Sequence, residues 1–401
     1  MRKSGVAGPL GLAVVIVAAA LTACSTSGAG AGANGPCDSP GVTADQVKFG
    51  FVFSDTGTGS EALSSARLGV DARIGLVNEE GGVKGRHIIY DWRDDAASPS
   101  TNVRVTQALS SSTFGLVGVT SSSGGSLDAL AKEGVPYIGL TQPSYAKYPN
   151  VFANVYDAAP ETIGRYFLAN GGTKVAMVST GGATFTVDLA ARYRSAFESI
   201  GLQVAPLIPF AASADSPARV AQQIADSGAN ALMGFTTVDD LAAIVQATRQ
   251  ANLALTSTVS TSGYDRGVLA SAGPALSGVS FPVYFRPFEA GGPAIDRYRA
   301  AMARFAPQAV QPEEKFAMYG YIYADMFVRG LELAGDCPTR EGFMNALRNV
   351  TDYDAGGLIE PTNLRTNPTT PLQCAAFVQV NPAGDAFRVV RERLCANGQG
   401  T

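Results

Sequence analysis

Residues Gly115–Leu140 read GLVGVTSSSGGSLDALAKEGVPYIGL, and this stretch decides the fold. The spacing predicts an apolar strand over Gly115–Thr120, a Ser/Gly loop over Ser121–Gly125, a helix N-capped by Ser126, and a second strand over Tyr137–Leu140. A loop that leaves the carboxyl end of a strand and enters a helix presents free N–H groups and hydroxyls. We therefore expect a small polar or anionic group to bind there.

The same alternation of strand, polar loop and helix recurs on both sides of this unit. Further apolar strands are predicted at 47–53, 87–92, 174–179, 202–208, 231–235 and 257–261, with helices between them and a closing β-hairpin over 375–390. This order predicts an α/β fold of two successive doubly wound halves, each with its loops at the carboxyl ends of its strands.

The N-terminus carries an export signal. Two basic residues precede an apolar run, Leu10–Ala20, that is too short to span a bilayer. The following Leu-Thr-Ala-Cys24 resembles a bacterial lipobox, which implies cleavage before Cys24 and its diacylation, with a plain secretory signal as the alternative. We therefore assign residues 1–23 to the signal peptide. Residues 24–37 are mostly small, and this composition predicts a flexible tether.

Composition argues against a nucleic-acid partner. Removal of the signal peptide takes away Arg2 and Lys3 and leaves 28 basic against 34 acidic residues, a net charge of −6. The sequence has no basic patch, and neutralising phosphates requires one.

Four cysteines remain once Cys24 is assigned to lipid. In an exported protein they predict two disulfides, for which three pairings are possible. We favour Cys37 with Cys395, which would join the ends of the fold, and Cys337 with Cys374. Zinc is not expected, because the sequence has no C-x-x-C pair and its single histidine, His87, is far from every cysteine.

Motifs for catalysis are missing. Gly57–Ala62, GTGSEA, satisfies G-x-G-x-x-A after a strand. A dinucleotide site expects an acid about 20 residues further on, and the nearest candidate at a strand end, Asp91, comes much later, so a ligand loop is the better interpretation. There is no G-x-S-x-G elbow, and a serine triad would have to use His87, which we interpret as structural. We expect no catalytic residue, metal or cofactor.

In contrast to catalytic motifs, the sequence contains many residues suited to binding a small molecule. They follow predicted strands in both halves, so they are expected to meet at the carboxyl edges of the two sheets, and aromatic rings of the second half can cover a ligand. Ordinary capping and turn roles are the alternative for any single residue. The candidates are Ser54, Thr56, Ser121, Ser122, Thr141, Gln142, Ser144, Phe185, Thr236, Thr237 and Tyr264.

The lipobox, the SDTGTGS turn, GGVKG, GVTSSSGGS and EGVPYIGLTQP, taken in this order, give the chain a family resemblance from Val47 to Val390. It resembles the solute-binding lipoproteins of branched-chain amino acid ABC transporters. The resemblance implies a type I periplasmic-binding-protein fold, in which two lobes joined by three crossovers close on a ligand by hinge motion. It implies lobe 1 at 38–157 and 285–350 and lobe 2 at 158–284 and 351–395. It also implies a monomer, held by lipid to the outer face of the cell membrane, that delivers its ligand to a permease.

The resemblance also assigns roles in the cleft. Ser121 or Ser122 and the loop Thr141–Ser144 match positions that hold a ligand carboxylate, while Phe185 matches a covering aromatic and Thr236 or Thr237 falls near a second one. The family places a glutamate against the ligand's ammonium, and Thr261 stands at that position here.

The departure at Thr261 indicates a carboxylate or neutral polar ligand rather than a standard α-amino acid, because an unpaired desolvated ammonium costs about 3–5 kcal/mol. Compensation by Asp239, Asp240 or Asp265 stays open. A ligand sensor for signalling and an exported hydrolase are the alternative functions.

Overall fold

A computed structural model describes residues 39–57, 60–180 and 184–400, with the side chains of residues 61 and 184–187 left out. The predicted signal peptide, Cys24 and Cys37 lie outside these ranges. Within them, no helix combines the length and the apolar character needed to cross a membrane.

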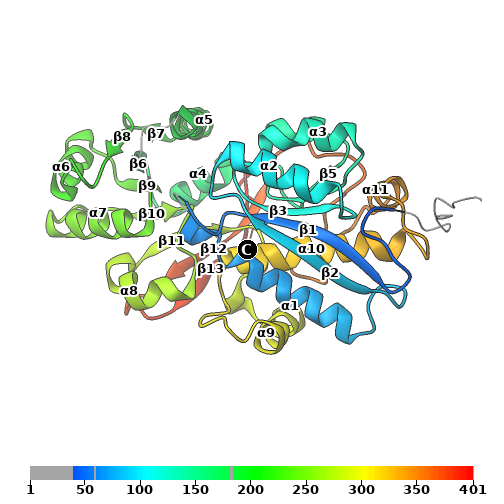
Figure 1. Ribbon diagram of the computed structural model, residues 1–401. Helices are drawn as coiled ribbons and strands as arrows, with labels where there is room; N and C mark the ends of the chain where they lie inside the picture. Colours follow the sequence, from blue (N-terminus) through cyan, green and yellow to red (C-terminus); the bar gives the residue numbers. More distant parts are fainter. Residues whose placement is uncertain (1–38, 58–59, 181–183, 401) are drawn as a thin grey trace, which may run out of the picture. The chain divides into compact units, whose positions relative to one another are not determined.

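The first half of the chain forms a five-stranded parallel sheet with the order β2-β1-β3-β4-β5 (Figure 1). The predicted strands are confirmed, including the two that flank the Ser/Gly loop. The bounds are β1 Gln46–Phe53, β2 His87–Asp94, β3 Leu116–Val119, β4 Tyr137–Gly139 and β5 Val151–Phe152.

Alternation along β1 explains why helices cover both faces of this sheet. Phe49, Phe51 and Phe53 belong to the apolar cluster that also contains residues of α1 (Ala66–Glu79) and α10 (Lys315–Leu333). Val52 belongs to a second cluster with residues of α2 (Pro99–Ser110) and α3 (Leu127–Lys132). Side chains two apart point to the same face of a strand, so β1 buries both of its sides.

The second sheet has eight strands. The order is β13-β12-β11-β10-β9-β6-β7, with β8 also pairing to β6, and only β12 runs antiparallel to its neighbours, β11 and β13. The strand predicted over 202–208 is in fact two short strands, β7 and β8. The bounds are β6 Lys174–Thr180, β7 Gln203–Val204, β8 Ile208–Phe210, β9 Ala231–Phe235, β10 Ser257–Ser260, β11 Val279–Val283, β12 Cys374–Val380 and β13 Phe387–Cys395.

Several helices begin where local sequence signals predict. Ser98 and Ser216 each precede a proline, and each side chain accepts a hydrogen bond from the N–H three residues later, which caps α2 and α6. The α-helices are α1 Ala66–Glu79, α2 Pro99–Ser110, α3 Leu127–Lys132, α4 Pro160–Ala169, α5 Thr184–Ser199, α6 Pro217–Ser227, α7 Val238–Gln250, α8 Arg266–Leu276, α9 Pro293–Phe305, α10 Lys315–Leu333 and α11 Arg340–Arg348. Short 3₁₀ helices are η1 Ser60–Ala62, η2 Ser123–Ser126, η3 Pro143–Lys147 and η4 Phe288–Ala290.

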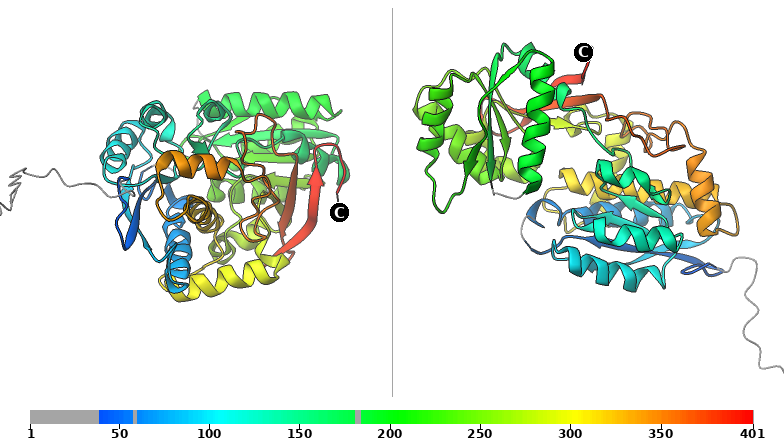
Figure 2. Two further views of the ribbon diagram at one scale, coloured as in Figure 1. Left: turned by 90° about the vertical axis from the view of Figure 1, so that its right-hand side faces the viewer. Right: turned by 90° about the horizontal axis from the view of Figure 1, so that it is seen from above.

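The chain passes between the two sheets three times. It leaves β5 for α4 and β6, returns from β11 to α9 and α10, which pack on α1, and leaves α11 for β12. The last of these segments, residues 349–373, is seen from above in Figure 2 between α11 and the second sheet. These three crossovers agree with the expected type I architecture.

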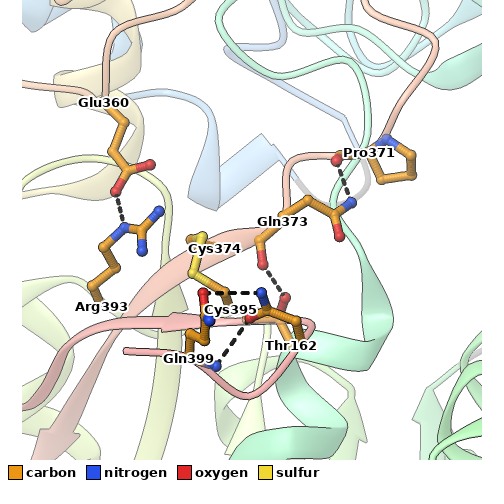
Figure 3. Close-up of a disulfide and its surroundings, with 9 residues drawn as sticks. Thr162, Glu360, Pro371, Gln373, Cys374, Arg393, Cys395 and Gln399 are labelled. Atoms are coloured by element: carbon orange, nitrogen blue, oxygen red, sulfur yellow. Dashed lines mark hydrogen bonds and ion pairs between the residues drawn. A yellow bond between two sulfur atoms is a disulfide. The ribbon is translucent and has the colours of Figure 1, made fainter. Parts of the chain in front are cut away.

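The disulfide pairing differs from the expectation. Cys374 is bonded to Cys395, so neither Cys37–Cys395 nor Cys337–Cys374 forms (Figure 3). Cys337 is also disulfide-bonded. The reason is the register of the closing hairpin: two irregularities between β12 and β13 place Cys374 directly opposite Cys395, whereas regular pairing counted from the turn would place it opposite Arg393.

Removing this disulfide is expected to destabilise the protein. The bond closes a loop with a sequence separation of 21, and its loss in the double variant Cys374→Ser/Cys395→Ser should lower the free energy of unfolding by about 2–3 kcal/mol. Denaturant unfolding of this variant and the wild type measures the difference. An unchanged midpoint would show that β12 and β13 are held by their hydrogen bonds alone.

Candidate functional site

The carboxyl edge of the first sheet is organised by Asp95, a fully buried residue just after β2. Its carboxylate accepts hydrogen bonds from the hydroxyls of Ser54 (2.8 Å) and Thr120, and from the Asn102 side-chain amide at 2.9 Å. Ser54 follows β1 and Thr120 follows β3. The structure therefore brings the loops after β1, β2 and β3 together, and it uses the predicted ligand residue Ser54 inside the protein.

The Ser/Gly loop is held to this network. The N–H of Ser122 donates to Thr120 Oγ1 at 2.9 Å, which buries Ser122 and leaves Ser121 exposed. Ser126 stands at the N-cap position of α3, as predicted, but its side chain does not cap the helix. It has helical φ and ψ at the end of η2, and its hydroxyl donates to Asn102 at 2.6 Å instead of accepting from a helix N–H. Ser121 is thus the more accessible of the two predicted serines.

Thr56 lies on the turn after β1 and is tied to Asp94. Its hydroxyl and its N–H donate to that carboxylate, as do the N–H groups of Asp55 and Ala96. Partial burial acts to raise the pKa of Asp94, but these hydrogen bonds outweigh it and the pKa is lowered. The charged carboxylate therefore shapes the turn that carries Thr56.

The third predicted loop of the first sheet follows β4. The Thr141 hydroxyl donates to the main-chain oxygen of Val155 at 2.8 Å, which connects this loop to the first crossover. Gln142 immediately precedes η3 and Ser144 is exposed within it. Of these three side chains, the amide of Gln142 and the hydroxyl of Ser144 are the better placed to meet a ligand.

The second sheet presents its own carboxyl edge through β6, β9 and β10, which are neighbours. Thr236 follows β9 and is buried, and its hydroxyl has no hydrogen-bond partner among the described residues. Thr237 caps α7 by accepting from the N–H of Asp240, and Asp240 in turn accepts from the Thr180 hydroxyl at 3.0 Å. Phe185 lies in the first turn of α5, and its side chain is outside the described part. The unpaired hydroxyl of Thr236 is the polar group here that a ligand would best satisfy.

Thr261, directly after β10, is contacted by a residue that no sequence motif singled out. The ammonium of Lys315, the first residue of α10, donates to the main-chain oxygen of Thr261 at 2.9 Å. Burial lowers the pKa of Lys315, although nearby Asp265 opposes this. Burial raises the pKa of Asp265, whose carboxylate accepts from the Lys315 N–H at 2.7 Å. The position expected to lack an acid is thus next to a cation, and the sequence separation of 54 between Thr261 and Lys315 explains why no sequence motif revealed this contact.

Tyr264 is more deeply buried than a residue that contacts a ligand needs to be. Its side chain is 2% exposed, and its hydroxyl donates to Glu289 at 2.6 Å and accepts from the Phe288 N–H at 2.9 Å. Burial raises the pKa of both Tyr264 and Glu289. Tyr264 contributes to packing between β10 and the second crossover. The remaining acid considered at this edge, Asp239, is exposed in the first turn of α7.

The described residues contain no group of three or more histidine, cysteine or acidic side chains that could hold a metal ion. His87 is exposed at the start of the edge strand β2. The two sheet edges supply hydroxyls, main-chain N–H groups, the Lys315 ammonium and aspartate carboxylates, most of which accept hydrogen bonds from the protein itself. This chemistry suits reversible binding of a small polar molecule.

Comparison with solved structures finds the same fold. A fatty acid ABC transporter substrate-binding protein from Thermomonospora curvata is similar in fold, with a TM-score of 0.76 and 20% identity, covering 90% of this chain and 96% of that one. The branched-chain amino acid binding protein LivJ from Streptococcus pneumoniae, in complex with isoleucine, has a TM-score of 0.71 and 18% identity over 86% of this chain and 99% of that one. A solute-binding protein of an ABC transporter from R. palustris, in complex with benzoate, has a TM-score of 0.69 and 18% identity over 86% and 95%.

No curated protein sequence matches the chain. The sequence model of one family, described as periplasmic binding protein, matches residues 46–385, which span the first sheet, all three crossovers and every strand of the second sheet except β13. The chain therefore belongs to the periplasmic binding protein family.

Proposed function

We propose that this protein is the extracytoplasmic solute-binding component of an ABC importer and that its ligand is a small organic carboxylate. In this proposal the two lobes have the bounds expected from the sequence: lobe 1 comprises residues 38–157 and 285–350, and lobe 2 comprises residues 158–284 and 351–395. Lipid on Cys24 would hold the protein, as a monomer, at the outer face of the cell membrane, where it passes ligand to a permease. The proposal assigns no catalysis to the chain.

One observation carries the choice of ligand: the Lys315 ammonium lies against Thr261 at the edge of the second sheet. An ammonium has three donors, and the Thr261 oxygen takes one of them. A ligand carboxylate would gain a charge-assisted hydrogen bond there, whereas the ammonium of an α-amino acid would be repelled. The titles of two similar structures name a fatty acid transporter and benzoate, so this fold accommodates monocarboxylates elsewhere.

A thermal-shift screen of the protein from Cys37 onward tests the ligand class with matched pairs, such as benzoate with benzamide and 4-methylpentanoate with leucine. A ligand at 100 times its Kd should stabilise the protein by about 2.7 kcal/mol. We expect a carboxylate to raise the melting temperature and its amide to do so less. Stabilisation by leucine, isoleucine or valine through the cleft, with none by carboxylates, would contradict the proposal.

Replacing Lys315 by methionine should weaken binding of the carboxylate found in that screen by about a hundredfold, because one charge-assisted hydrogen bond is lost. Stability should change little, since burial already disfavours the Lys315 charge. Isothermal titration calorimetry measures the affinity. Lys174→Met, at the amino end of β6, is the matched control and should bind like the wild type. Equal losses in both variants would assign the effect to net charge.

A further inference from the structure

A cavity lies at the crossovers between the two sheets. It has a volume of about 470 Å³, and its lining includes residues of all three crossovers together with β12 and β13. Among described residues, the lining contains none of the predicted ligand residues. Its size falls within the range of about 300–1,000 Å³ typical of small-molecule sites.

Asn154, on the first crossover, is a buried polar residue in the lining of this cavity. Its side chain is 5% exposed, and neither its amide oxygen nor its amide nitrogen has a hydrogen-bond partner in the described structure. A buried amide left unpaired on both atoms costs free energy that a bound molecule can recover. The molecule that does so must present a donor to Oδ1 and an acceptor to Nδ2.

The charged side chains of the lining further restrict the class of molecule that this cavity can bind. Arg393 is held by Glu360, with Nε and Oε1 2.6 Å apart (Figure 3). Arg286 donates only to the main-chain oxygens of Gly291 and Ala290 and, within the described ranges, has no acidic partner. Glu392, which is exposed, forms no ion pair there either. The cavity therefore carries one uncompensated positive charge and one uncompensated negative charge.

The rest of the lining is largely apolar, with Val283, Leu358, Ile359, Leu372 and Val389 among its members. An anionic ligand would be attracted by Arg286 but repelled by Glu392. A cationic ligand would be attracted by Glu392 but repelled by Arg286. A zwitterion is complementary to both charges and to both atoms of the Asn154 amide, and its apolar body would cover the aliphatic wall.

We propose that this crossover cavity is a second binding site, for a small zwitterion with an apolar side chain, of the size of an amino acid or a dipeptide. The site is independent of the carboxylate proposed for the cleft. Because its lining comes from all three crossovers, a molecule bound here contacts every connection between the sheets. Its affinity is therefore linked to the angle between them.

The test is calorimetry of the whole mature chain with leucine and dileucine as probes, beside 4-methylpentanoate and 3-methylbutylamine, each of which keeps one charge. We expect at least one zwitterion to bind. Asn154→Leu should abolish that binding while raising the melting temperature, since it removes an unpaired buried amide. Glu392→Gln should weaken it at least tenfold, and Arg388→Gln, an exposed β13 residue outside the lining, should leave it unchanged.

Absence of binding by both zwitterions would overturn this proposal. So would binding that is lost in Lys315→Met and kept in Asn154→Leu, because the zwitterion would then occupy the cleft, and the carboxylate proposal would fail with it. If carboxylates give no response while Asn154-dependent zwitterion binding persists, the cleft proposal alone fails.

Discussion

Replacing Asp95 by alanine is expected to lower the free energy of unfolding by about 4 kcal/mol, the largest loss of stability that we predict for a polar residue. The carboxylate is fully buried and accepts from Ser54, Thr120 and Asn102 as well as from the Ala97 N–H at 3.0 Å. Its removal would leave several buried donors without a partner. The loops after β1, β2 and β3 would lose their common anchor, so ligand affinity should fall together with stability.

Asp94 provides a matched control for this experiment. It is the adjacent acid and also accepts several hydrogen bonds, but it is only partly buried. Water can replace those bonds, and Asp94→Ala should cost about 1 kcal/mol. Denaturant unfolding of both variants measures the contrast. Similar losses in the two would mean that burial of the Asp95 network adds nothing to its strength.

Replacing Gly320 by alanine is expected to cost about 3 kcal/mol or more, although alanine is the better helix former. Gly320 of α10 lies against α1, and a β-carbon there would be 2.0 Å from the main-chain oxygen of Ala66. Gly69 of α1 has the reciprocal position, where a β-carbon would be 1.8 Å from the Ala317 oxygen. Since the obstacles are backbone atoms, the two helices would have to separate.

Gly267 shows what the same substitution does without an obstacle. It lies in α8, is exposed, and has no atom within 4 Å of a β-carbon placed on it. Gly267→Ala should therefore stabilise the protein by up to about 1 kcal/mol. Thermal unfolding of both variants tests the difference in sign. A stable Gly320→Ala protein would show that α1 and α10 can shift apart at little cost.

Local pattern predicted most of the fold. The apolar strand at 47–53 and the two strands that flank the Ser/Gly loop depend on neighbours within a few residues, so the sequence displays them directly. Loops that follow adjacent parallel strands lie at the same edge of the sheet. The hydrogen bond between Ser54 and Thr120, at 3.2 Å, confirms this for the loops after β1 and β3. The roles of the predicted ligand residues stay a prediction.

Other features depend on contacts between distant segments. Asp95 follows Asp94 directly in the sequence, and nothing local distinguishes the two acids; only the packing of three loops around Asp95 makes it an internal anchor. Likewise, Lys315 reaches Thr261 because α10 returns from the second crossover, and no periodicity encodes that approach.

The sequence by itself therefore determined the fold class, the two halves and the sheet edges that carry polar loops, because short-range periodicity and turn chemistry specify each element. Only the tertiary structure decided the pairing of Cys374 with Cys395, the cation beside Thr261 and the unpaired amide of Asn154 in the crossover cavity. Each of these depends on register shifts or on the packing of segments far apart in the chain, which no local pattern contains.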